Sequence, residues 1–259
     1  MVPMRILFVF ILALILTSCG LNTKETESPV VNDPLPDFSN FTDVKEKKEA
    51  FFEFLLPLVY EANARIMKER KLVMKWQKGK RLTTAEKKTL ASIKTKYRVT
   101  TDDIEEQKTL LLRRILLIPP SIVLAQAANE SAWGTSRFAR EGNNLFGLWC
   151  FSVGCGIVPG ERNHRSKHEV KVFKSPFYSV SSYMRNLNSH EQYQDLRLIR
   201  EKALLDYESI DGLQLAEGLL GYSERREEYV VEIQQMIRSN NLQDLDADPL
   251  GKGINNGQQ

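Results

Sequence analysis

Apolar and polar positions alternate with a helical period over most of the chain between residues 41 and 240. The first such stretch places apolar side chains on one stripe of a helix, at Phe51, Leu55, Leu58, Ala62 and Ile66. Pro57 lies inside this stripe, and because proline lacks a backbone N–H we predict a kink or a break near Leu56. The pattern therefore predicts a helical region that begins near residue 41.

The basic stretch at residues 67–97 predicts two helices joined at residues 77–80. Thr83 or Thr84 caps the second of these helices, and Glu86 lies in its first turn. Such basic helices could rest on anionic lipid or on the acidic peptides of a cell wall, although a solvated lysine face is the favoured interpretation. A further helix follows Asp102 and Asp103 and ends at two consecutive prolines, 119 and 120.

Helical and strand patterns follow one another in the second half of the chain. A helix is predicted at residues 121–133, and it ends near Gly134. Between residues 148 and 173, β-branched residues alternate around glycines, which predicts a small β-hairpin lobe. Helical spacing returns after residue 175, and the polar tail at 243–259 is predicted to be disordered. The predicted fold class is therefore mainly α (α+β).

The first twenty residues contain Arg5, an apolar run at 6–16 and small residues up to Cys19. A run of about eleven apolar residues is half of what a bilayer-spanning helix needs, so it is typical of a secretory signal. The sequence LTSC at 16–19 resembles the lipobox of bacterial lipoproteins, which implies that residues 1–18 are removed and Cys19 is lipidated. An ordinary signal with an incidental cysteine is the alternative.

The residue after Cys19 is Gly20 rather than Asp, which by the usual sorting pattern favours an outer-membrane anchor that faces the periplasm. Residues 19–40 are rich in polar residues and proline, and they are predicted to form a flexible tether. Composition adds little beyond this. The chain has 36 basic and 33 acidic residues, and this balance argues against a nucleic-acid partner.

The other two cysteines, Cys150 and Cys155, lie five residues apart with glycines at 154 and 156. In an oxidising compartment they can close a small disulfide loop. A metal pair is the weaker interpretation, because the three histidines show no tight ligand spacing with the cysteines. Nothing in the sequence calls for a metal or another cofactor, and no oligomeric state is predicted.

Glu130 is the candidate catalytic residue of the helix at 121–133. Helical spacing places it on one face with Val123, Gln126 and Ala127, and close in sequence to Trp133. A carboxyl group among such side chains loses hydration when it ionises, so its pKa rises, as a general acid requires. A surface glutamate in the last helical turn is the alternative.

The residues around Glu130, QAANESAWGTSRFAREGNNLFG at 126–147, resemble the signature of bacterial endo-β-N-acetylglucosaminidases of glycoside hydrolase family 73. The stretches 149–190 and 221–229 are similar to the Bax-type branch of that family. This resemblance implies a lysozyme-like helical domain at 119–242 with a β-lobe across a cleft, preceded by accessory helices at 41–118. It also implies action on peptidoglycan glycan strands, with cleavage of the β-1,4 bond between N-acetylglucosamine and N-acetylmuramic acid. Glu130 would protonate the leaving oxygen.

The resemblance implies a second carboxylate in the β-lobe, and two glutamates compete for this role. Glu161 follows a Val-Pro-Gly turn, whereas Glu169 lies on a predicted strand, and we slightly favour Glu169 because a strand fixes a side chain better. The choice between inverting, retaining and substrate-assisted chemistry stays open.

Further site residues are implied by the same resemblance. Tyr222 matches the tyrosine of the family's Tyr-Ala-Thr-Asp segment, although Ser-Glu-Arg follows it here, and Tyr229 matches a later tyrosine. The predicted walls of the groove are Asn143, Asn144, Phe146 and Trp149, with Trp149 suited to stacking on a sugar ring or to packing in the core.

Three other functions remain open at this point. A muramidase or lytic transglycosylase would use the same fold and a glutamate at the same helix end. A cysteine peptidase would use Cys150 with His168 or His190, unless Cys155 pairs with the nucleophile. A lipid-anchored protein could also bind peptidoglycan without cleaving it.

Overall fold

The computed structural model describes residues 29–160, 168–206 and 209–251. Its α-helices are α1 (Val44–Gln77), α2 (Thr84–Lys96), α3 (Ile104–Arg114), α4 (Pro120–Ser131), α5 (Arg137–Gly142), α6 (Pro176–Ser189), α7 (Gln194–Leu205), α8 (Gly212–Ala216) and α9 (Glu227–Ser239). Short 3-10 helices are η1 (Pro29–Asn32), η2 (Phe38–Asn40), η3 (Glu191–Tyr193), η4 (Glu217–Leu219) and η5 (Leu242–Ala247). The strands are β1 (Trp149–Cys150), β2 (Gly156–Ile157) and β3 (Glu169–Lys171). This confirms the predicted mainly helical fold with accessory helices and a small β-lobe.

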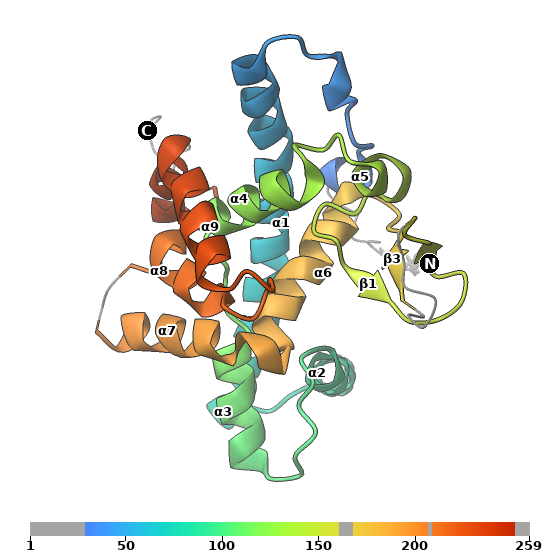
Figure 1. Ribbon diagram of the computed structural model, residues 1–259. Coiled ribbons are helices and arrows are strands. Elements are labelled where there is room, and N and C mark those ends of the chain that lie inside the picture. The colour runs from blue at the N-terminus through green and yellow to red at the C-terminus, as the bar shows by residue number, and fades with distance from the viewer. Residues whose placement is uncertain (1–28, 161–167, 207–208, 252–259) are drawn as a thin grey trace, which may run out of the picture.

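Helix α4 lies in the middle of the molecule, with α8 and α9 on one side and α5 and the strands on the other (Figure 1). Every residue from Pro120 to Ala128 is buried, because α1, α8, α9 and η5 all contact this helix. A helix that is apolar all round is expected in such a central position. Helix α4 therefore connects the helices before residue 118 to those after residue 210 through one core.

The sequence predicts a kink or a break near Leu56; helix α1 runs without interruption through Pro57, so a break does not occur. Proline removes one backbone hydrogen bond. Leu55, Leu58 and Val59 are buried on either side of it, and α1 packs on α4 and α6. Burial of the apolar stripe on both sides of the proline therefore outweighs the lost hydrogen bond.

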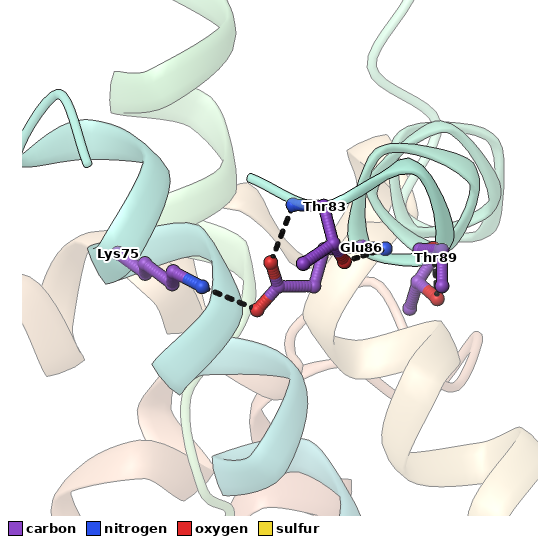
Figure 2. A network of polar contacts seen from close by, with 5 residues as sticks. Lys75, Thr83, Glu86 and Thr89 are labelled. Carbon is purple, nitrogen blue, oxygen red and sulfur yellow. Dashed lines mark hydrogen bonds and ion pairs between the residues drawn. The ribbon is translucent and has the colours of Figure 1, made fainter. Parts of the chain in front are cut away.

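The junction between α1 and α2 forms as predicted, and Thr83 is the residue that caps α2 (Figure 2). Its hydroxyl accepts from the Glu86 N–H at 3.2 Å, and the Glu86 carboxylate accepts from the Thr83 N–H at 2.8 Å. The same carboxylate pairs with Lys75 of α1 at 2.6 Å. This reciprocal capping box fixes where α2 starts and joins it to the end of α1.

Parts of the predicted tether and tail are ordered and packed on the core. Val31 and Phe38 are completely or almost completely buried, and Phe38 packs edge-on against Phe51 of α1. In the tail, the Asp246 carboxylate accepts from the Ser121 N–H and hydroxyl and from the Gly212 N–H. A few anchoring side chains suffice to order segments whose composition is otherwise polar. Cys19 and the rest of residues 1–28 lie outside the described residues, as do residues 252–259.

The β-lobe is a three-stranded antiparallel sheet in which β3 lies between β1 and β2, rather than a simple hairpin. Trp149 pairs with Val170, and Gly156 pairs with Lys171. Glycine is required at 156, because a Cβ there would lie 2.1 Å from the Val170 carbonyl oxygen. Within the described ranges, no helix combines the length and the apolar character needed to cross a bilayer.

Candidate active site

A cleft of about 750 Å³ lies between the C-terminal end of α4, the β-lobe and α6. Its lining includes Glu130 from α4, Phe146 and Trp149 from the segment leading into the sheet, Lys171 from β3, Arg185 from α6, and Tyr222. The cleft is open to solvent, as a site for a polymeric substrate must be. It brings together predicted site residues that are up to 92 positions apart, from Glu130 to Tyr222.

Glu130 lies in the last turn of α4, and the backbone beyond it explains why the helix stops there. Ala132, Trp133 and Gly134 all have positive φ angles of 50°, 60° and 77°. The Ser131 hydroxyl accepts from the Gly134 N–H at 2.8 Å, which replaces a helical bond. A side chain at 134 would lie 2.6 Å from the Phe38 ring, so only glycine permits this close turn. The turn leaves the Glu130 carboxyl half-buried at the floor of the cleft.

A chain of hydrogen bonds from the core ends on Glu130. The Tyr183 hydroxyl donates to Gln126 Oε1, and Gln126 Nε2 donates to the Tyr229 hydroxyl at 2.8 Å. The Tyr229 hydroxyl in turn donates to Glu130 Oε1 at 2.7 Å. Each bond points towards the carboxylate, so each polarises the next one in the direction that favours negative charge on Glu130.

Two opposing effects act on the protonation of Glu130. Burial raises the pKa of its carboxyl, and the Tyr229 and Asn129 hydrogen bonds partly offset this increase. The nearby Glu232 also raises the pKa, and Arg225 lowers it. The result is a carboxyl with a raised pKa that is also held in a fixed orientation by Tyr229, both of which suit a general acid.

The side chains that desolvate Glu130 differ from those expected. The ring of Trp133 packs edge-on against Phe51 and Phe52 of α1, with centroids 5.8 and 5.2 Å away. Tyrosines surround the acid instead, because the Tyr222 ring stacks on Tyr229 with centroids 5.2 Å apart. The positive φ of Trp133 turns its side chain towards α1 and so separates it from the residue three positions earlier.

Tyr222 and Phe146 form a single wall of the cleft. The Tyr222 hydroxyl donates to the Phe146 carbonyl at 3.0 Å, and the Phe146 ring stacks on Tyr183 with centroids 3.9 Å apart. Trp149 lies at the rim, 58% exposed, with its ring stacked on His168 at 4.0 Å. A core position for Trp149 is therefore wrong, and this exposed ring is suited to stacking on a sugar.

Asn143 and Asn144 support the wall, but neither is part of the cleft lining. The Asn144 amide donates to the carbonyls of Leu148 and Lys171 at 2.9 and 2.8 Å, and its oxygen accepts from two backbone N–H groups. The Asn143 amide donates to the Phe173 carbonyl at 3.0 Å. These side chains tie the turn after α5 to β3, so their amides are engaged within the protein rather than with a sugar.

Glu169, the favoured second carboxylate, does not line the cleft. It is buried, and its two oxygens accept from the N–H groups of Gly154 and Gly156 at 3.0 and 2.8 Å. The strand does fix this side chain, but it fixes it towards the loop between β1 and β2. Glu161 lies outside the described residues. Among the described residues that line the cleft, Glu130 is the one carboxylate.

Cys150 and Cys155 are joined by a disulfide that closes this same loop. The pairing leaves Cys150 without the free thiol that a cysteine peptidase would need. Both sulfurs and the Glu169 carboxylate lie within 4.8 Å of one another. A disulfide sulfur is not a thiolate, however, so this group does not fit a metal ion.

Four residues of the site were missed by the sequence analysis as functional residues: Gln126 and Tyr183 in the hydrogen-bond chain, and Arg98 and Arg185 in the cleft lining. Gln126 offered a signal, because it is a polar residue on the same helical face as Glu130. Arg98 offered none, since it comes from the connection after α2, outside the segment that carries the resemblance.

Residues 108–242, about half of the chain, match the family described as Glucosaminidase, mannosyl-glycoprotein endo-beta-N-acetylglucosaminidase. The chain belongs to this glucosaminidase family. The family match includes Glu130 and most of the cleft, and it confirms the resemblance to glycoside hydrolase family 73. Arg98 alone among the lining residues lies before the matched segment.

Two curated relatives agree with this family assignment. The chain is 32% identical over 197 residues to Protein bax of Escherichia coli (strain K12), which covers 75% of this chain and 70% of the relative. It is 30% identical over 101 residues to Exo-glucosaminidase LytG of Bacillus subtilis (strain 168), and this match covers 36% of each chain. The first of these supports the Bax-type branch. No solved structure gives a significant match.

Proposed function

We propose that the protein is a peptidoglycan hydrolase that cleaves the β-1,4 bond between N-acetylglucosamine and N-acetylmuramic acid, with Glu130 as the general acid. The observation that carries this proposal is the half-buried Glu130 carboxyl at the floor of the cleft, with its pKa raised by burial and its orientation held by Tyr229. The glucosaminidase family and the name of the Bacillus relative support the coarser part of this proposal, a glucosaminidase activity.

In the proposed reaction Glu130 gives its proton to the bridging oxygen as the bond from that oxygen to the anomeric carbon breaks. The bonding electrons leave with the oxygen, and positive charge develops on the sugar ring. Water then adds to the anomeric carbon and releases a proton to a base. Because a sugar alkoxide leaves poorly, loss of the acid should cost about 10² to 10⁴ in rate, or about 3–5 kcal/mol of barrier.

Two groups are candidates for the base or nucleophile of the second step: a second carboxylate of the protein, or the acetamido group of the substrate. The hydrogen bonds of Glu169 to the loop amides argue for a structural role, so Glu161 becomes our preferred second carboxylate. The alternative is attack by the acetamido group of the substrate itself, which requires no second carboxylate. The anomeric configuration of the first product and the rate of Glu161→Gln distinguish these routes.

The proposal is tested by digestion of purified peptidoglycan, reduction of the products with borohydride and mass spectrometry of the new ends. Wild type, Glu130→Gln and Glu141→Gln are compared, because Glu141 is an exposed glutamate of α5 outside the cleft lining. We expect reduced N-acetylglucosamine ends from wild type and Glu141→Gln, and few or none from Glu130→Gln.

Other outcomes of this digestion would indicate a different activity on peptidoglycan. Reduced muramic acid ends would indicate a muramidase, and anhydromuramic ends would indicate a lytic transglycosylase. Binding of peptidoglycan without release of any fragment would instead indicate a wall-binding protein.

We further propose that the protein works in the cell envelope, anchored by a lipidated Cys19 in the outer membrane and facing the periplasm. The support is the lipobox-like LTSC sequence and a substrate that lies in the same compartment. Labelling with a palmitate analogue, followed by membrane fractionation of wild type and Cys19→Ala, tests this. Label on the Cys19→Ala protein would contradict it.

A further inference from the structure

The lining of the cleft contains two arginines, Arg98 and Arg185. Both are exposed, and neither forms an ion pair with any described residue. His190 lies with them, and burial followed by the charge of Arg98 lowers the pKa of this imidazole. Glu191 is also near His190, but it pairs with neither arginine in the described part.

The position of Arg98 is fixed by the backbone around it. Its φ angle is 57°, which is uncommon for a residue with a side chain. Arg114 Nη1 donates to the carbonyls of both Tyr97 and Arg98, at 2.8 Å each. The Tyr97 hydroxyl and Lys96 both bond Glu69 of α1, at 2.7 Å each. The accessory helices therefore hold this arginine at the cleft before any ligand binds.

Arg185 projects from α6 and contributes to two cavities. It lines the main cleft, and it also lines a second cavity of about 290 Å³ together with Tyr97. Lys171 from β3 adds a third positive charge to the cleft lining, where Glu130 is the one carboxylate among the described residues. The cleft is therefore cationic apart from its acid, which suits a ligand that carries carboxylates.

We propose that Arg98 and Arg185 bind a carboxylate of the peptide stem carried by the muramic acid of peptidoglycan, so that the enzyme prefers peptide-bearing glycan to glycan without stems. This inference rests on the proposed function. Guanidinium groups present paired N–H donors that match a carboxylate. A stem of four residues reaches about 13 Å from the sugar, so it can leave the cleft past Arg185 towards the second cavity.

The inference assigns a role to the region before the matched family segment. Arg98 precedes residue 108, so the preference would be a property of this chain's accessory helices rather than of the family domain alone. A solvated pair of arginines with no ligand is the alternative, and it predicts no preference between the two substrates.

The test compares kcat/KM for soluble peptide-bearing glycan with kcat/KM for the same glycan after an amidase has removed the stems and the lactyl carboxylates so exposed have been converted to amides. We expect wild type to prefer the peptide-bearing form, and Arg98→Gln/Arg185→Gln to reduce the ratio of the two values by about ten-fold. The preference of wild type should also weaken as salt is added, because the attraction is between charges.

The matched control is Arg81→Gln/Arg238→Gln, which removes two exposed arginines outside the cleft lining and should keep the wild-type ratio. Arg185→Gln alone serves if the double variant does not fold.

Two results would overturn the inference: equal losses on both substrates in the cleft variant, or the same change of ratio in the control. A separate binding measurement distinguishes this inference from the proposed reaction. Calorimetry is run with a free stem tetrapeptide and with the same peptide after amidation of its carboxylates. If the unamidated tetrapeptide binds and its binding depends on the two arginines, but no glycan is cleaved, the stem site is supported and the proposed glucosaminidase reaction is refuted. Cleavage without preference or peptide binding would refute the stem site alone.

Discussion

Replacing Tyr229 by phenylalanine removes one oxygen from the chain of hydrogen bonds that ends on Glu130. The Tyr229 hydroxyl donates to Glu130 Oε1 at 2.7 Å and accepts from Gln126 Nε2 at 2.8 Å, and the ring is buried. The substitution therefore deprives Glu130 of a donor and Gln126 of an acceptor, and it leaves the packing of the ring unchanged.

The stability cost follows from Gln126, which has no exposed surface in the fold. A buried polar group left without its partner costs about 1–3 kcal/mol. At about 2–4 °C per kcal/mol for a chain of this size, the midpoint of thermal unfolding should fall by roughly 2–12 °C. Calorimetry or circular dichroism measures this fall.

The effect on catalysis follows from Glu130. The Tyr229 hydrogen bond favours the ionised carboxylate, so its loss should raise the pKa of Glu130 further above its ordinary range. A general acid works while it is protonated, so the alkaline limb of the pH profile of kcat/KM should move to higher pH. An alkaline limb that stays in place, or moves to lower pH, would refute this account of the site.

Tyr97→Phe is a matched control for both measurements. The Tyr97 hydroxyl also donates to a glutamate, Glu69, at 2.7 Å, but Tyr97 does not line the cleft. This variant should lose stability while its alkaline limb stays at the wild-type pH. A shift of the limb in both variants would show that general loosening of the fold, rather than the bond to Glu130, is responsible.

Three further predictions concern stability and the division of roles. Glu169→Gln replaces one of two oxygens that accept backbone N–H groups, so thermal unfolding should show that the free energy of unfolding falls by about 1–3 kcal/mol. The rate of cleavage should fall far less than in Glu130→Gln. Equal rate losses in the two variants would make Glu169 catalytic. Gly218→Ala places a Cβ 2.3 Å from the Leu196 Cα, and because backbone cannot yield easily, denaturant titration should show a loss of at least about 1–3 kcal/mol. Burial raises the folded-state pKa of Glu130, so wild type loses stability as pH rises through that pKa. The melting temperature of Glu130→Gln minus that of wild type should therefore be larger at pH 8 than at pH 4. A smaller value at pH 8 would contradict this prediction.

Local chemistry in the sequence was sufficient for several features. The capping box of Thr83 and Glu86 uses groups three residues apart, and the disulfide joins cysteines five residues apart. The end of α4 near Gly134 likewise depends on a turn that neighbouring residues form. Spacing and residue type specify such features because their partners are close in the chain, and the position of Glu130 at a helix end was predictable for the same reason.

Contacts between distant segments were decided only by the tertiary structure. Tyr229 reaches Glu130 across 99 positions, and Asp246 reaches Ser121 across 125. Neither pairing leaves a periodic trace in the sequence. The direction of Glu169 depended on which neighbour offered N–H groups, and the placement of Arg98 in the cleft depended on how α2 packs against α1. The helices, the cap and the acid were thus determined locally, whereas the surroundings that set the acid's protonation, and the charges along its cleft, came from packing.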